Sequence, residues 1–136
     1  MGTEVFTGIT PVDTSNSGVY QLRISVGKIC SISIGKLGTF TFPAGQYIYT
    51  GRAKINLRQR IDRHKKTDKK CSWHIDYLLT EENVQIQDIS VISQNSGREC
   101  SENKKLLMGN ASIVAEGFRA ADCQADCRAH LLYLGT

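Results

Sequence analysis

The sequence predicts an α+β fold in which a small antiparallel sheet is flanked by helices. Alternating apolar residues over 19–25, 28–34 and 39–42 indicate strands, and the glycine-containing segment 35–38 supplies a turn between the last two. Residues 55–66 instead place apolar side chains four positions apart, which is the spacing of an amphipathic helix. The first third of the chain is therefore expected to be an antiparallel meander with an inserted hairpin.

The later part of the chain adds further strands and helices to this plan. Strands are expected at 47–49, 84–93 and 131–134, with a brief pairing at 113–114, and helices are expected at 72–79 and 98–108. Ser72 is expected to cap the first of these helices, because a serine side chain accepts hydrogen bonds from free backbone N–H groups. Gly109 and Asn110 are expected to end the second helix.

Length and composition indicate a single globular domain. A chain of 136 residues is long enough to bury about two-thirds of its unfolded surface. We expect one domain over 18–136 and a flexible leader over 1–17, with a short edge strand at 4–9. No apolar run reaches the roughly 18 residues that a membrane span needs, and the first residues lack the features of a signal peptide. Five cysteines, an odd number, predict reduced thiols and a cytoplasmic location.

Positive charge is concentrated in one segment. Between Arg52 and Lys70 the chain has nine basic residues and two acidic ones, a local charge of +7, whereas the whole chain carries +4. The remainder is therefore at −3. A basic segment beside tyrosines is what a nucleic-acid backbone prefers, through counterion release and base stacking. A solvated helix face is the plainer interpretation of such a charge run.

Arg60 and His64 lie four residues apart in the predicted helix. At about 100° per residue they fall on the same arc as Leu57 and Ile61, so their side chains are expected to point inward. Burying a bare charge is costly, so an inward arginine must be paired or line a cleft. Two interpretations stay open, an ion pair beside a core histidine or a functional site.

Two carboxylates open the helix expected at 98–108. Glu99 and Glu102 are three residues apart and share a helix face. A carboxylate presented toward a phosphate is a suitable ligand for Mg²⁺, which is often held by one or two such groups. Acidic residues in a first helical turn also interact favourably with the helix dipole, which is a purely structural explanation.

Soft metal ligands gather near the C-terminus. Cys123, Cys127 and His130 fall within eight residues, and Cys100 could complete a tetrahedral zinc site. The spacing matches no common zinc motif, and buried free cysteines often serve as small apolar residues. A zinc-stabilised interaction domain is therefore a third alternative for this chain. The sequence contains no nucleophilic-serine elbow, phosphate-cradling glycine loop or dinucleotide fingerprint.

An ordered set of these residues resembles the GIY-YIG nuclease signature. The set is Gly18-Val19-Tyr20, then Tyr49-Thr50-Gly51, then Asn56-Leu57 with Arg60 and His64. The resemblance is closer to a branch of small, poorly characterised proteins that occur alone or fused to an endonuclease III-type repair glycosylase. It covers roughly 18–134, and segments 42–45, 73–78, 98–100 and 117–131 carry it in particular.

The resemblance implies a three-stranded antiparallel core with the inserted hairpin, and hydrolysis of DNA phosphodiester bonds with one divalent ion, Mg²⁺ or Mn²⁺. One of Tyr20 and Tyr49 would help a water molecule attack phosphorus. Arg60 would neutralise the charge that develops on the phosphorus centre, and His64 would take or relay a proton. Glu99 would hold the metal ion.

Other positions follow from the same resemblance. Glu102 is the reserve metal ligand. His74 and Asp76 would contact the catalytic side chains and orient them without touching the substrate. The family's asparagine after the metal glutamate has no clear counterpart, although Asn110 is a candidate. The implied setting is DNA repair or processing, with a functional link to a base-excision repair glycosylase. Independently of the resemblance, the charge pattern of the basic segment predicts contacts with DNA from Arg52, Lys54, Arg58, Arg63, Lys65 and Lys66.

A second function class fits the same residues. A non-catalytic nucleic-acid-binding module would keep the fold and the basic segment while cleaving nothing. It would show salt-dependent binding, because each basic side chain that neutralises a phosphate releases counterions.

Overall fold

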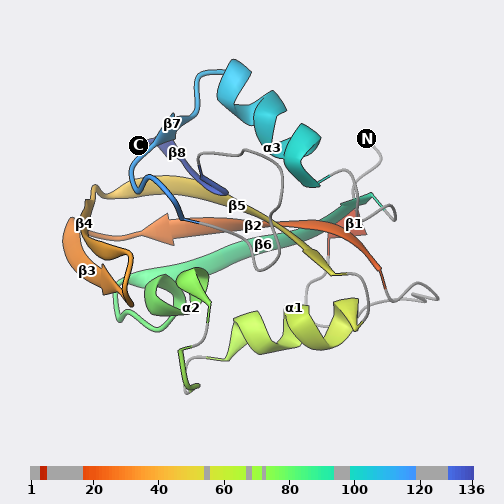
Figure 1. Cartoon of the computed structure of the whole chain (residues 1–136), viewed down its shortest axis with the longest axis horizontal. Coiled ribbons are helices and arrows are strands. Elements are labelled where there is room, and N and C mark those ends of the chain that lie inside the picture. The colour runs from red at the N-terminus through yellow and green to blue at the C-terminus, as the bar shows by residue number, and fades with distance from the viewer. Residues whose placement is uncertain are drawn as a thin grey trace.

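A computed structural model gives the arrangement of the chain (Figure 1). It describes residues 4–5, 17–53, 56–66, 69–71, 73–93, 99–118 and 129–136. Of these, seven residues are described by their backbone alone: Glu4, Val5, Ser93, Glu99, Cys100, Ser101 and Leu107.

The main sheet is antiparallel throughout and is wider than the sequence predicts. Its strand order is β1-β6-β2-β5-β8-β7, and a separate hairpin pairs β3 with β4. The three long strands β6, β2 and β5 are neighbours, which confirms the predicted three-stranded core with an inserted hairpin. The strands are β1 (Glu4–Val5), β2 (Gly18–Val26), β3 (Cys30–Ile34), β4 (Gly38–Phe42), β5 (Gly45–Ala53), β6 (Val84–Ser93), β7 (Ser112–Ile113) and β8 (Leu131–Gly135).

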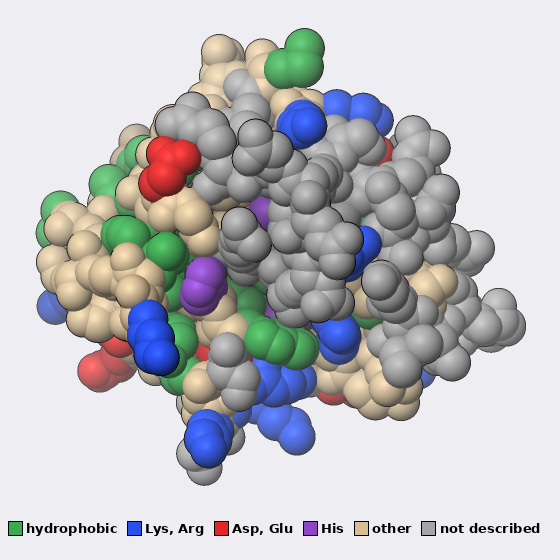
Figure 2. Space-filling model, in the orientation of Figure 1, with side chains coloured by type: hydrophobic (Ala, Val, Ile, Leu, Met, Phe, Trp, Pro, Cys, Tyr) green, Lys and Arg blue, Asp and Glu red, His purple; other side chains and the backbone are tan. Residues whose placement is uncertain are grey.

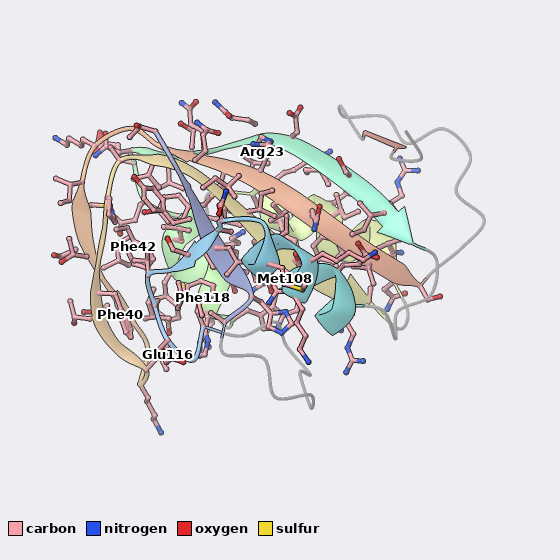
Figure 3. The ribbon with its side chains drawn as sticks, turned by 90° about the horizontal axis from the view of Figure 1, so that it is seen from above. Arg23, Phe40, Phe42, Met108, Glu116 and Phe118 are labelled. Carbon is pink, nitrogen blue, oxygen red and sulfur yellow. The ribbon has the colours of Figure 1, made fainter. Side chains whose placement is uncertain are left out.

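Helices lie on both faces of this sheet. On one face are α1 (Leu57–Lys65) and α2 (His74–Leu79), and on the other is α3 (Glu99–Met108) (Figure 1). Seen from above, α3, which ends at Met108, is on the near side of the sheet and the other two helices are behind it (Figure 3). The predicted α+β class is therefore confirmed.

The hydrophobic core lies between the sheet and the α1–α2 layer. Tyr20, Leu22 and Ile24 alternate along β2 and are all buried, as the period-2 pattern predicts. Leu57 and Ile61 form the buried stripe of α1, each only 1% exposed. Strand alternation and helical periodicity thus direct their apolar side chains into one shared core.

The start of α2 differs from the prediction. The helix begins at His74 with Trp73 as its N-cap residue, whereas Ser72 was expected to cap it and lies outside the described residues. Asp76, the third residue of the helix, accepts a hydrogen bond of 2.8 Å from the backbone N–H of Trp73. A carboxylate that reaches back in this way satisfies the N–H of the N-cap residue at the helix start.

Other boundaries move by small amounts. The helix expected at 55–66 is described from Leu57 to Lys65, and β5 is longer than the predicted aromatic segment 47–49. Of the expected edge strand at 4–9, Glu4–Val5 is β1 and the rest lies outside the described residues. Among the residues that the structure describes, no helix combines the length and hydrophobicity that crossing a membrane requires.

Candidate functional site

Tyr20 and His64 form the centre of the candidate site. The Tyr20 hydroxyl and His64 Nε2 are 2.7 Å apart, which joins strand β2 to helix α1 across 44 residues of sequence. Tyr49 on β5 presents its ring edge-on to His64, with ring centroids 6.0 Å apart. The structure therefore brings together three of the predicted catalytic residues. All three are buried, with exposed fractions of 2%, 1% and 2% for Tyr20, His64 and Tyr49.

Gly51 makes room for this arrangement. It lies directly opposite Tyr20 in the register of β2 and β5. A Cβ atom at position 51 would be 2.7 Å from the Tyr20 hydroxyl and 3.0 Å from the Tyr49 ring, closer than packed side chains allow. The glycine of the second triplet therefore has a steric role, because it lets both tyrosine rings pack beside the strand.

Replacing Gly51 with alanine is expected to lower the free energy of unfolding by about 1–3 kcal/mol, because the added methyl group forces the Tyr20 ring out of place. Urea denaturation measures the change. Gly109→Ala is the matched control, since a Cβ there would meet only atoms at 3.6 Å or beyond. Equal stability of the two variants would contradict the steric role of Gly51.

His64 is held in its neutral form. Burial lowers the pKa of its imidazole to about 3, and the positive charges of Lys69, Arg63 and Arg60 act in the same direction, while Asp76 opposes them. The second ring nitrogen, Nδ1, is buried and has no hydrogen-bond partner among the described residues. A neutral imidazole has one N–H donor and one acceptor nitrogen, so His64 Nε2 either accepts a hydrogen bond from the Tyr20 hydroxyl or donates one to it, according to the tautomer.

The low pKa of His64 predicts acid-sensitive stability. As the pH falls below about 6.5, His64 becomes protonated in the unfolded chain, whereas in the folded chain it stays neutral down to about pH 3. The free energy of unfolding therefore decreases as the pH falls through this window. Between pH 6.5 and 5 the loss is expected to be about 1.5 kcal/mol from this group. Urea denaturation at several pH values measures it, and His64→Gln should flatten the profile. An unchanged slope in that variant would contradict the assignment.

Arg60 lies one helical turn before His64 at the border of the core. Its guanidinium donates a hydrogen bond of 3.2 Å to the backbone carbonyl of Arg52 and stacks over the Trp73 ring at 5.2 Å from the ring centroid. The side chain is half-buried, unlike the exposed Arg58 on the same helix. The predicted inward direction of Arg60 and His64 is therefore confirmed for His64 and met in part by Arg60.

Asp76 neutralises the neighbouring cations. Its buried carboxylate accepts a hydrogen bond of 2.8 Å from Arg63 Nη1, and Lys69 Nζ lies 3.7 Å away. Lys69 also donates hydrogen bonds to the last carbonyls of α1, those of Arg63 and His64. Desolvation lowers the pKa of the Lys69 ammonium group. Arg63, expected to contact DNA, is thus engaged within the protein, and its role in DNA binding stays a prediction.

The outer side of α1 carries an exposed basic surface. Lys and Arg side chains gather over α1 and the segment that follows it (Figure 2). We call this the basic surface, and its exposed members are Arg58, Lys65, Lys66 and Lys70. Arg52 is half-buried at the end of β5, and Lys54 lies outside the described residues. The surface adjoins Arg60, so a polyanion bound to it would pass close to the candidate site.

The side chain of Glu99, the predicted metal ligand, lies outside the described part of the structure. Glu99 begins α3, on the opposite face of the sheet from α1 (Figure 1), and only its backbone is described. The reserve ligand, Glu102, accepts a hydrogen bond of 3.1 Å from Lys105. Among the described residues no group of three His, Cys, Asp or Glu side chains could hold a metal ion. Asn110, the candidate asparagine, is exposed with φ +83°, as suits a helix end.

The remaining predicted residues are only partly described. His74 places its ring edge-on to Phe118, with centroids 5.7 Å apart. His130 is buried, and its Nδ1 lies 3.1 Å from the carbonyl oxygen of Thr50. The side chains of Cys100, Cys123 and Cys127 lie outside the described part of the chain, so the zinc site stays a prediction. Cys30 and Cys71 are free thiols.

Sequence reasoning missed three residues of this region. Trp73 is half-buried and contacts Arg60, Arg63 and His64 through its ring. Lys69 was grouped with the solvated basic residues. Asn103 is fully buried and donates a hydrogen bond of 2.6 Å to the Ala129 carbonyl, which ties α3 to the start of β8. An asparagine in a helix interior, which is an unfavourable position for it, was the available signal for that role.

Fold and site together define a small α+β domain with a buried tyrosine–histidine pair beneath a basic helix. The family model described as "Domain of unknown function DUF123" matches residues 19–136. The chain belongs to that family. No curated protein and no solved structure matches it.

Proposed function

We propose that this protein is a nuclease of the GIY-YIG type that hydrolyses DNA phosphodiester bonds with one Mg²⁺ or Mn²⁺ ion. The observation that carries the proposal is the 2.7 Å contact between Tyr20 and His64. Residues from the first triplet and from the helix after the second triplet meet there, with Tyr49 beside them. The adjoining basic surface supplies the positive charge that a DNA backbone prefers.

Each residue has a role that its position suits. Arg60 carries a permanent charge next to the basic surface and would stabilise the negative charge that develops on a phosphate. Tyr20 would assist the attacking water, and its hydrogen bond to His64 would hold the hydroxyl in place. A divalent ion would supply Lewis-acid polarisation of the phosphate, and Glu99 is the residue to which the family resemblance gives the role of holding it.

Cleavage of plasmid and branched DNA tests the proposal. The wild-type protein is expected to cut in Mg²⁺ or Mn²⁺, and Glu99→Ala is expected to remove the activity. Glu102→Ala is the matched control, because its side chain is already paired on the same helix. Full activity of Glu99→Ala together with loss in Glu102→Ala would reassign the metal ligand. Cleavage that survives both Glu99→Ala and Arg60→Ala would overturn the proposal.

A non-catalytic nucleic-acid-binding module is the second candidate function. The burial of Tyr20, Tyr49 and His64 favours it, because a catalytic group has to reach its substrate. The exposed basic surface would then be the functional part. This candidate predicts DNA or RNA binding that weakens steeply with salt, and no cleavage with any metal ion. Binding that is insensitive to salt would exclude it.

The cellular setting follows from the family resemblance alone. We propose a cytoplasmic protein of DNA repair or processing that works with a base-excision repair glycosylase. Co-purification of the tagged protein with such a glycosylase, resistant to nuclease treatment, is the expected result. Loss of the association after nuclease treatment would show that DNA alone connects the two.

A further inference from the structure

Three cations surround Trp73 and Asp76, and they differ in how their charge is balanced. Arg63 donates to the Asp76 carboxylate at 2.8 Å, and Lys69 lies 3.7 Å from the same carboxylate. Arg60 has no acidic partner among the residues that the structure describes. Within the described part of the chain, its guanidinium contacts a backbone carbonyl and the ring of Trp73.

The face of an aromatic ring can hold the Arg60 guanidinium while leaving it able to bind a phosphate. An acidic partner would compete with a phosphate for the guanidinium, whereas an aromatic face attracts the charge and leaves the edge N–H groups free to donate. Trp73 is itself held in place. Its backbone N–H donates to Asp76 at 2.8 Å, and its ring packs against His64 with centroids 5.5 Å apart.

We propose that Trp73 is a positioning residue, which holds Arg60 as an uncompensated cation for one phosphate of a bound nucleic acid. The inference rests on the nucleic-acid partner of the proposed function but not on cleavage. Arg60 then provides a phosphate subsite at the border between the basic surface and the Tyr20–His64 pair. Arg63 also stacks on Trp73, with its guanidinium carbon 4.4 Å from the ring centroid. Its charge, unlike that of Arg60, is neutralised by Asp76.

The test measures the binding of a labelled DNA duplex by fluorescence anisotropy, without metal ions and over a range of salt concentrations. Trp73→Leu keeps an apolar side chain but removes the π face, and it is expected to weaken binding about 5- to 10-fold. It should also reduce the slope of log affinity against log salt by about one, as the loss of one phosphate contact does. Arg60→Gln should give the same loss of slope, and Trp73→Phe should restore most of the affinity.

A double-mutant cycle separates positioning from a structural role. If Trp73 acts through Arg60, then Trp73→Leu in an Arg60→Gln background should cause no further loss of affinity. A full additional loss there, or equal weakening by Trp73→Phe and Trp73→Leu, would overturn the inference. Arg58→Gln, on the exposed side of the same helix, is the control in which Trp73→Leu should still have its whole effect.

The single tryptophan also reports on the subsite directly. Trp73 is the only tryptophan in the chain, so intrinsic fluorescence comes from this one ring. Adding unlabelled duplex without metal should change the emission of the wild-type protein and of Arg58→Gln, and leave Arg60→Gln nearly unchanged. An equal response in all three proteins would contradict the subsite. Because these measurements involve no cleavage, an inactive wild type would count against the nuclease proposal and leave this inference standing.

Discussion

If the protein is the proposed nuclease, Arg60→Ala is expected to reduce DNA cleavage by about 10²- to 10³-fold, which is the usual effect of removing one preorganised donor from a developing anion. The loss should then fall mainly on kcat, because the charge that Arg60 would stabilise arises in the transition state. The free energy of unfolding should change little, by about 1 kcal/mol, since the side chain is half-buried and forms one hydrogen bond to a carbonyl and one cation–π contact. Single-turnover cleavage and urea denaturation measure the two effects.

Two variants make this expectation specific to Arg60. Arg58→Ala removes an equal charge from the exposed side of the same helix, so it should weaken DNA affinity slightly and leave kcat unchanged. Arg60→Lys keeps the charge but loses the planar fork, so it should recover only part of the rate. A wild-type rate in Arg60→Ala would exclude Arg60 from the chemistry, and equal losses in Arg58→Ala and Arg60→Ala would reduce its role to general attraction.

Much of the fold could be predicted where an element is buried mainly on one side. Tyr20, Leu22 and Ile24 alternate with less buried residues along β2, and that alternation is the signal of a strand. Strand β6 was predicted with its observed bounds, Val84–Ser93. The width of the sheet could not be predicted from one sequence. Strands as short as β1 and β7, two residues each, have no period to detect, and their pairing depends on neighbours far away in the chain.

The candidate site was predictable where a local spacing decides the geometry. A separation of four residues on a helix places His64 beside Ile61 on the buried face, and the structure confirms it. The spacing of residues along the sequence does not, however, show which side chains form ion pairs. Arg63 and Lys69 were grouped with surface charges, although both engage a carboxylate that is 13 and 7 residues away, respectively. The stacking of Arg60 on Trp73 likewise arises only when α1 and α2 come together.

Replacing the buried Asp76 with alanine is expected to lower the free energy of unfolding by about 3 kcal/mol. The carboxylate is fully buried and lies within 4 Å of two cations, one of which, Lys69, has a side chain only 5% exposed. Removing the anion leaves Lys69 buried without its partner and frees the N–H of Trp73 at the start of α2. The free energy of unfolding from urea denaturation measures the effect.

Asp76→Asn separates charge from hydrogen bonding at this position. The amide oxygen can still accept from the Trp73 N–H, so the helix start is kept, but the two cations lose their counter-charge. We expect Asp76→Asn to be intermediate between wild type and Asp76→Ala. Asp62→Ala, an exposed acidic residue on α1, should stay within about 0.5 kcal/mol of wild type. If Asp76→Ala were as stable as Asp62→Ala, the Asp76 carboxylate would not balance the charges of Arg63 and Lys69, and Arg60 would no longer differ from them in lacking a counter-charge.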